Sequence, residues 1–143
     1  MPDTNSAATT RPGNLPVPIP FIESLGAQLR EMTEGHAVAT MMPRPEHMNS
    51  WAVVHGGVLM ALLDFVMAMA GRSARTDLEG EAGGNLTIEM KTSFIRPAKG
   101  ELTIKAQCLH AGRSLSFCEG EIRDADDRIV ARASGTFKFW KNP

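Results

Sequence analysis

The strongest helical pattern in the chain runs from Gly57 to Ala70 (GVLMALLDFVMAMA). This segment is rich in Leu, Met and Ala and has no interior Gly or Pro, which predicts an α-helix. Apolar residues occupy its whole circumference, so we expect a helix that is buried on nearly every side. Gly71-Arg72-Ser73 and the Gly-rich stretch that follows are expected to end it.

After this helix, apolar and polar residues alternate, which is typical of β-strands with one buried face. The predicted strands cover residues 86–94, 102–108, 115–122 and 129–140. In the first of them, Leu86, Ile88 and Phe94 belong to the apolar set, and Pro97 ends the run. Period-two alternation with short turns predicts an antiparallel meander that packs one face on the core.

The chain before the helix is less regular. Residues 1–20 are rich in Ser, Thr and Pro, and we predict a disordered leader because such a stretch cannot bury enough surface to offset its ordering entropy. A single domain is expected over residues 21–143. Within it, residues 21–29 predict a short helix, and residues 28–42 predict two short strands that turn at Glu34-Gly35.

A helix that is buried all round and followed by a long antiparallel sheet has few packing solutions. The sheet must curl around the helix, because only that arrangement covers the helix on every side. We therefore predict an α+β fold in which a curved antiparallel sheet wraps around one long central helix. Such a sheet leaves open edges, so pairing with a second copy of the chain is expected.

The composition is that of an ordinary globular protein, with 143 residues, 43% of them hydrophobic, and a net charge of −1. This near-neutral charge gives no reason to expect a nucleic-acid or membrane partner. We find no segment with the ~18 to 20 apolar residues needed to span a bilayer. The N-terminus also lacks the basic start and apolar middle of a signal peptide, so a cytoplasmic protein is expected.

Neither a metal site nor a disulfide framework is indicated by the His and Cys residues. Ligand spacing is missing among the scattered histidines, which are His36, His47, His55 and His110. Cys108 and Cys118 fall in predicted strands. We interpret them as reduced packing residues, with a bridge between them as the less favoured alternative.

Asp64 is the only charged residue in the apolar helix. An ionised carboxylate in such a setting costs several kcal/mol unless it is paired or hydrogen-bonded. Capping is a poor explanation, because Asp64 lies about two turns inside the helix start. A structural ion pair remains an alternative, and a catalytic carboxylate is the favoured interpretation.

The helix start supplies a second chemical feature. Gly56 and Gly57 leave backbone N–H groups open at a helix N-terminus, where they can polarise a carbonyl and hold a developing oxyanion. The alternative is that these glycines only permit close packing. Gly56 and Asp64 are separated by roughly 12 Å along a helix, whereas a catalytic base must come within ~3 Å of its proton, directly or through one water. If both act on one substrate, the site must combine the helix start of one subunit with Asp64 of another.

Asn49, His55-Gly56-Gly57 and Asp64, spaced N-x5-H-G-G-x6-D, resemble the signature of hotdog-fold acyl-CoA thioesterases of the PaaI-like, phenylacetate-degradation group. Residues 85–98 (NLTIEMKTSFIRPA), 112–114 (GRS) and 131–137 (ARASGTF) are also similar, and the likeness covers about residues 25–140. The resemblance implies hydrolysis of an aryl- or medium-chain acyl-CoA without cofactor or metal. It also implies a homodimer that associates further into a dimer of dimers.

The resemblance implies a role for each matching residue. Asp64 would be the general base or nucleophile, and the Gly56 N–H would polarise the thioester carbonyl. His55 and Asn49 would orient the carbonyl or sulfur side and support the helix start. Thr87, early in the first strand after the helix, would help to position water.

Candidate substrate-binding residues are Gly57 at the helix start and Arg113 and Ser114 at a turn. In relatives this turn often lies near the CoA nucleotide, so Arg113 and Ser114 are expected to contact its phosphates, with an ordinary solvated turn as the alternative. The acyl group is expected beside the helix, near Leu59, Leu62, Leu63 and Met67.

Two other functions are compatible with the same fold. One is hydration or dehydration of a 3-hydroxyacyl thioester, and the other is non-catalytic binding of acyl-CoA. The tandem glycines directly after His55, with Asp64 nine residues later, favour the thioesterase over the first. A binding module would need an appended DNA-binding segment or a degraded motif, and neither is visible.

Overall fold

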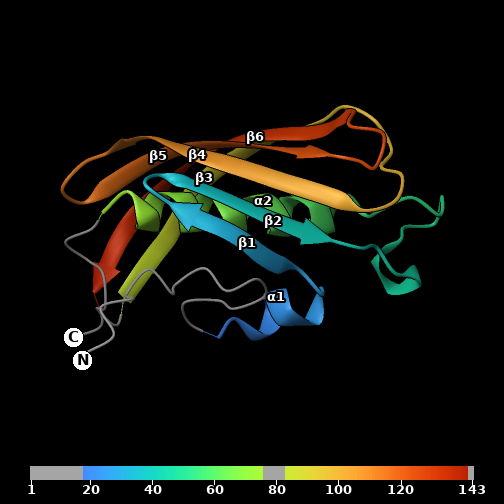
Figure 1. The fold of residues 1–143 in the computed structure, drawn as a ribbon, viewed down its shortest axis with the longest axis horizontal. Helices are drawn as coiled ribbons and strands as arrows, with labels where there is room; N and C mark the ends of the chain where they lie inside the picture. Colours follow the sequence, from blue (N-terminus) through green and yellow to red (C-terminus); the bar gives the residue numbers. More distant parts are fainter. Residues whose placement is uncertain (1–17, 76–82, 142–143) are drawn as a thin grey trace, which may run out of the picture.

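The computed structural model describes residues 18–75 and 83–141. Its elements in chain order are α1 (Pro20–Ser24), β1 (Gln28–Thr33), β2 (His36–Met41), η2 (Pro45–His47), α2 (Gly56–Ser73), β3 (Gly83–Phe94), β4 (Leu102–Ala111), β5 (Leu115–Arg123) and β6 (Ile129–Lys141). The strands form one antiparallel sheet of order β1-β2-β4-β5-β6-β3. This sheet curves over α2 (Figure 1), which confirms the predicted α+β hotdog fold.

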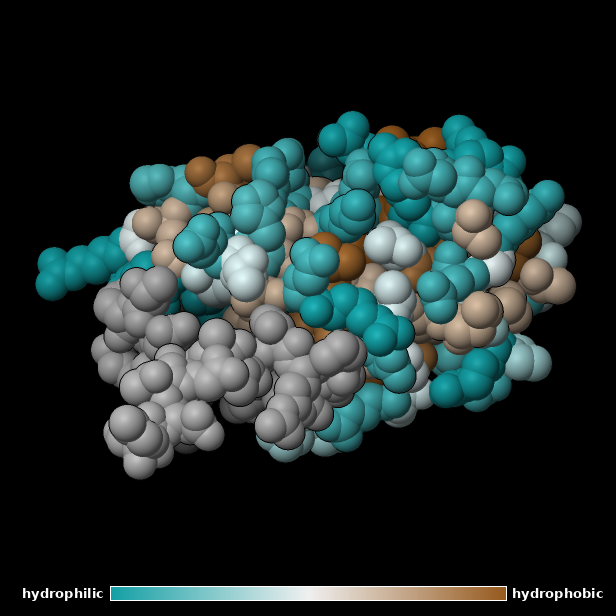
Figure 2. Space-filling view, viewed as in Figure 1, coloured by the Kyte–Doolittle hydropathy of each residue, from teal (hydrophilic) through white to brown (hydrophobic). Residues whose placement is uncertain are grey.

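The core lies between α2 and the concave face of the sheet. Side chains of α2 meet alternate side chains of the strands, and the largest fully buried ones include Leu62, Leu63, Met67, Ile104, Ile122 and Phe137. Each such side chain contributes about 1.5–3 kcal/mol relative to an exposed position. The coloured part of the face seen in Figure 2 is mainly hydrophilic, with smaller hydrophobic areas between the hydrophilic side chains.

The N-terminal elements follow the prediction only in part. The two strands that turn at Glu34-Gly35 are confirmed as β1 and β2. The first helix is shorter than predicted, because Gly26 adopts a φ of 73° and β1 begins at Gln28. Of the predicted leader, residues 1–17 lie outside the described residues.

The central helix differs from the prediction at its C-terminal end. It continues through Gly71 to Ser73 instead of stopping at Gly71. A Cβ at Gly71 would lie 2.8 Å from both Asn85 Nδ2 and Ser116 Oγ, so glycine here permits the close approach of β3 and β5. In length and hydropathy α2 also qualifies as a membrane span, contrary to our expectation. Because half of it is buried within this fold, core packing accounts for its apolar character.

The expectation that this helix is buried on nearly every side is wrong for one stripe. Gly57 and Met60 are exposed, and Ala61, Asp64 and Ala68 are only half-buried. Their spacing places them on a single helix face. This face lies beside β3, the last strand of the sheet, so nothing in the described part of the chain covers it fully.

β3 also departs from the simple alternation that the sequence suggests. A register shift between Thr87 and Glu89 marks a β-bulge at Ile88. Before the bulge, Asn85 and Thr87 point toward α2, whereas Leu86 and Ile88 are 52% and 54% exposed. β3 is therefore an edge strand with apolar side chains on its open side, a feature that favours pairing with another chain.

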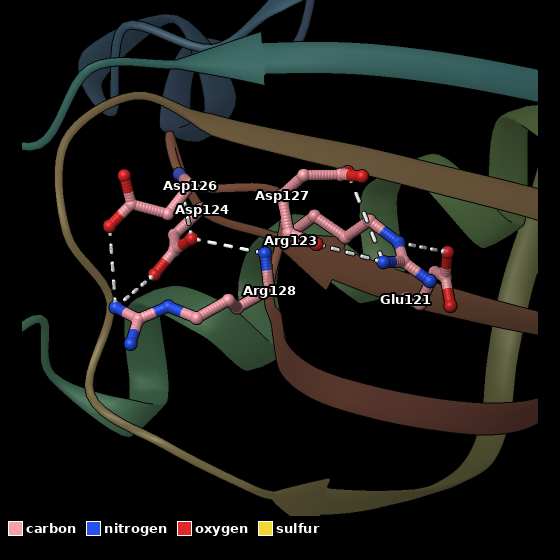
Figure 3. Close-up of polar contacts among 6 residues, drawn as sticks. All are labelled: Glu121, Arg123, Asp124, Asp126, Asp127 and Arg128. Atoms are coloured by element: carbon pink, nitrogen blue, oxygen red, sulfur yellow. Dashed lines mark hydrogen bonds and ion pairs between the residues drawn. The ribbon is translucent and has the colours of Figure 1, made fainter.

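The turn between β5 and β6 is held by a buried carboxylate (Figure 3). Asp124 accepts hydrogen bonds from the backbone N–H groups of Asp126 and Arg128, at 3.0 and 3.2 Å. Its second oxygen pairs with Arg128 Nη2 at 3.2 Å. Burial raises the pKa of Asp124, but the backbone hydrogen bonds and the Arg128 charge outweigh it, so the pKa lies below its usual value of 3.8.

We expect the Asp124→Asn substitution to lower the free energy of unfolding at neutral pH and to have a smaller effect in acid. A carboxyl whose pKa is lowered by folding stabilises the protein above its unfolded-state pKa of about 3.9, and that stabilisation disappears as the pH falls through the folded-state pKa. Urea unfolding of the wild type and the variant at several pH values would measure the difference in their free energies of unfolding. The wild type should exceed the variant in free energy of unfolding at pH 7, and the gap should narrow below about pH 4. An equal gap at pH 7 and pH 3 would contradict this assignment.

Candidate active site

The start of α2 is built by His55. Its backbone φ and ψ of −59° and 135° are non-helical, and its Nδ1 accepts a hydrogen bond from the Gly57 N–H at 2.8 Å. The His55 carbonyl accepts from Val58 and Leu59. An Nδ1 that accepts a hydrogen bond leaves the proton of a neutral imidazole on Nε2, so His55 presents a donor at this end of the helix.

These contacts leave Gly56 as the free donor. Its N–H has no partner among the described residues, whereas the N–H groups of Gly57, Val58 and Leu59 all have one. The Gly57 N–H, predicted to bind substrate, is therefore already used in a hydrogen bond to His55 and is not available to a substrate carbonyl. A Cβ at Gly56 would lie 3.3 Å from the ring of Phe94, which is 53% exposed at the end of β3. The helix start thus has one open N–H beside an aromatic ring, a suitable setting for a polarised carbonyl.

Asn49 shapes the loop that leads into α2. Its Oδ1 accepts hydrogen bonds from the N–H of Trp51 at 2.9 Å and of Val53 at 3.4 Å. Its own N–H donates to the Val53 carbonyl. The Asn49 side chain is thereby engaged in closing a tight loop, which holds Trp51 outward with 83% of its surface exposed.

Asp64 lies in the middle of α2 and faces β3. Its Oδ1 accepts a hydrogen bond from the Thr87 hydroxyl at 2.5 Å. Two residues earlier on the same strand, Asn85 Nδ2 donates to the Ala68 carbonyl at 2.9 Å. The structure therefore brings together two residues that were predicted separately, Asp64 and Thr87, and Asn85 fixes the strand one helical turn further along.

β3 runs beside α2 in the opposite direction. Asn85 contacts Ala68, Thr87 contacts Asp64, and Phe94 lies over Gly56. One edge strand thus touches both chemical features of the helix, the carboxylate and the open N–H. The two remain separated by eight residues of continuous helix, roughly 12 Å.

Arg113 and Ser114 lie at the other end of the helix. Arg75, two residues beyond α2, donates from Nη1 to the carbonyls of Gly112 and Arg113, both at 2.9 Å. Its guanidinium also lies over the Phe139 ring at 4.9 Å from the centroid. The turn is anchored by its backbone, and the Arg113 and Ser114 side chains are exposed. Within one chain they are therefore far from Gly56.

Asn85 and Phe94 are two site residues that the sequence analysis did not single out. Asn85 shares its strand face with Thr87, so period-two spacing from Thr87 could have found it. Phe94 lies beyond the bulge, and no local pattern places its ring over Gly56. Among the described residues, no group of three or more His, Cys, Asp or Glu side chains is arranged to hold a metal ion.

Comparison with known proteins connects this geometry to a family. Residues 52–131 match the thioesterase superfamily. The chain is 34% identical over 122 residues to a Mycobacterium tuberculosis protein provisionally named as an esterase, covering 85% of this chain and 86% of that protein. It is 32% identical over 115 residues to the acyl-coenzyme A thioesterase PaaI of Escherichia coli, covering 79% and 77% of the two chains.

Solved structures agree with these matches. A conserved protein from Pseudomonas aeruginosa superimposes with a TM-score of 0.78 at 31% identity, covering 86% of this chain and 95% of that one. A hypothetical thioesterase from Streptococcus pneumoniae, determined with coenzyme A, gives a TM-score of 0.70 at 25% identity, covering 81% and 87% of the two chains.

Proposed function

This chain belongs to the thioesterase superfamily, and we propose that it hydrolyses the thioester bond of an aryl- or medium-chain acyl-CoA to the free acid and CoA. The observation that carries this proposal is the pairing of Asp64 with Thr87 at an open sheet edge, together with a Gly56 N–H that has no partner within residues 18–75 and 83–141. A carboxylate can supply the base or nucleophile for attack on the thioester carbon, and an N–H donor can stabilise the charge that develops on the carbonyl oxygen.

In the proposed reaction, the Gly56 N–H donates to the thioester carbonyl oxygen and stabilises the negative charge that develops there. Asp64 acts as general base toward water or as nucleophile toward the carbonyl carbon. Thr87 donates to one carboxylate oxygen and fixes its direction, which leaves the other oxygen for the reaction. His55 and Asn49 maintain the helix start, and the exposed position of Gly57 leaves room for the thioester.

The site is proposed to form between subunits. One helix cannot direct Gly56 and Asp64 at the same carbon, because they lie roughly 12 Å apart. The exposed apolar side chains of β3 support pairing of two chains along this edge, and so does the incompletely covered face of α2 that contains Met60 and Asp64. The Asp64 of one chain would then face the helix start of its partner. A dimer of dimers would extend the same unit.

The CoA nucleotide is proposed to lie over the turn that contains Arg113 and Ser114. Arg75 holds the carbonyls of this turn, so the Arg113 guanidinium is available for phosphate oxygens. We place the enzyme in the cytoplasm.

Thiol release from a panel of acyl-CoA substrates tests the activity. We expect turnover of aryl- and medium-chain substrates, with free CoA and free acid formed in equal amounts. The same panel should include 2-enoyl- and 3-hydroxyacyl-CoA, whose interconversion without thiol release would indicate a hydratase or dehydratase instead. Binding of acyl-CoA without release of thiol from any substrate would overturn the proposed hydrolysis and favour a binding module.

A further inference from the structure

The two cysteines of this chain lie directly opposite each other on neighbouring strands. Cys108 on β4 is the register partner of Cys118 on β5, and both side chains point to the concave face. The structure holds them as free thiols. Directly opposed residues in an antiparallel pair have the closest side chains that a sheet offers, so this placement brings two reactive groups together.

The backbone geometry at this pair suits a covalent bond. The Cys108 N–H donates to the Gly35 carbonyl at 2.7 Å, on the β2 side of the strand. The Cys108 N–H therefore points away from β5, and the β-bulge in this strand pair comes after it, between Cys108 and His110, so we infer that Cys108 and Cys118 are a non-hydrogen-bonded pair. Such pairs have Cα atoms about 4.5 Å apart, within the span of about 4.4–6.8 Å that a disulfide bridges without backbone movement.

The two thiols differ in exposure. Cys108 is half-buried, whereas Cys118 is 2% exposed and contacts the α2 backbone near Gly71. A reagent in solution therefore reaches Cys108 first. Burial and the neighbouring Cys108 sulfur raise the pKa of the Cys118 thiol to about 12. Cys118 is thus protected from direct attack and is positioned to react with whatever becomes attached to Cys108.

We propose that Cys108 and Cys118 form a reversible intramolecular disulfide in the folded protein by exchange with a small-molecule disulfide. The Cys108 thiolate attacks one sulfur of the disulfide, forms a mixed disulfide and releases the first thiol. The Cys118 thiol gives up its proton through water and attacks the Cys108 sulfur, which breaks the mixed disulfide, and the expelled thiolate takes up a proton and leaves as the second thiol. Two electrons pass from the two cysteines to the small molecule, and reduction by a thiol runs the same steps backward.

Incubation of the full-length native protein with oxidised glutathione at pH 8.5, followed by alkylation under denaturing conditions, tests this proposal. The expected product is a monomeric polypeptide that has lost about 2 Da, the mass of two hydrogen atoms. It should carry no alkyl groups and yield a peptide pair linked through Cys108 and Cys118. Dithiothreitol should restore both thiols. A disulfide-linked dimer, a stable glutathione adduct on Cys108, or bridging only after denaturation would each overturn the proposal.

Matched variants test whether bridging depends on the register of the two cysteines or only on the presence of two thiols. Cys118→Ala should stop at one glutathione attached to Cys108, and Cys108→Ala should resist modification while folded. The double change Cys108→Ala with Ala106→Cys keeps two thiols on the same two strands but moves one to a diagonal position, about 7–8 Å away. This variant should not form the bridge. Equal bridging in this variant and the wild type would show that the register does not control the reaction.

Discussion

Replacing Asp64 with alanine is expected to lower kcat for acyl-CoA hydrolysis on the order of 10³-fold, because general-base catalysis by a positioned side chain contributes about 10²–10⁴. The fold should persist, since Asp64 is only half-buried on the open stripe of α2 and its removal leaves no core cavity. Release of CoA thiol under saturating substrate measures the effect. Turnover at the wild-type rate would rule out Asp64 as the catalytic carboxylate.

Two further variants show what Asp64 contributes. Asp64→Asn keeps the shape and the acceptor for Thr87 but removes the charge, so it should be nearly as inactive as Asp64→Ala. Thr87→Val removes only the hydroxyl that orients the carboxylate. Loss of a hydrogen bond to a charged group costs about 1.5–3 kcal/mol, so a decrease in kcat of roughly tenfold to a hundredfold is expected. A larger effect from Thr87→Val than from Asp64→Asn would reverse the proposed roles.

The fold could be predicted from the sequence where the information is local. The alternating segments predicted the ranges of the strands, and the apolar run predicted the range of the central helix, each to within a few residues. Gly71 was misread as a helix stop, because the reason for that glycine lies in residues far along the chain, Asn85 and Ser116. The exposed apolar side of β3 was also missed. It depends on a bulge at Ile88, which reverses the two faces and leaves no signal in the alternation.

The site shows the same division between local and distant information. Asp64 and the His55-Gly56 helix start stand out in the sequence because a charge and paired glycines interrupt an apolar pattern. Thr87 was reached through family resemblance, and the structure places it against Asp64. The Gly56 N–H was likewise named as the donor through family resemblance, and the structure adds the physical reason, because the Gly57 N–H already donates to His55.

The Gly56 N–H can be removed without disturbing the helix. Proline is well tolerated at the first position of a helix and lacks the N–H. Gly56→Pro is therefore expected to lower kcat by about 10²–10³, the usual cost of one oxyanion donor. Gly56→Ala is the matched control, because it keeps the N–H but also places a Cβ against Phe94. Equal losses in both variants would assign the effect to the Phe94 contact instead of the N–H.

A mixture of Asp64→Ala and Gly56→Pro subunits is expected to recover activity that neither variant has alone. If each site uses the helix start of one chain and Asp64 of the other, a heterodimer contains one intact site and one doubly defective site. Random pairing of a 1:1 mixture makes half of the dimers heterodimers, so about a quarter of the wild-type activity should return. The variants would be unfolded together and refolded, with wild type and each single variant treated in parallel. Activity no higher than the mean of the two variants would show that each site lies within one chain.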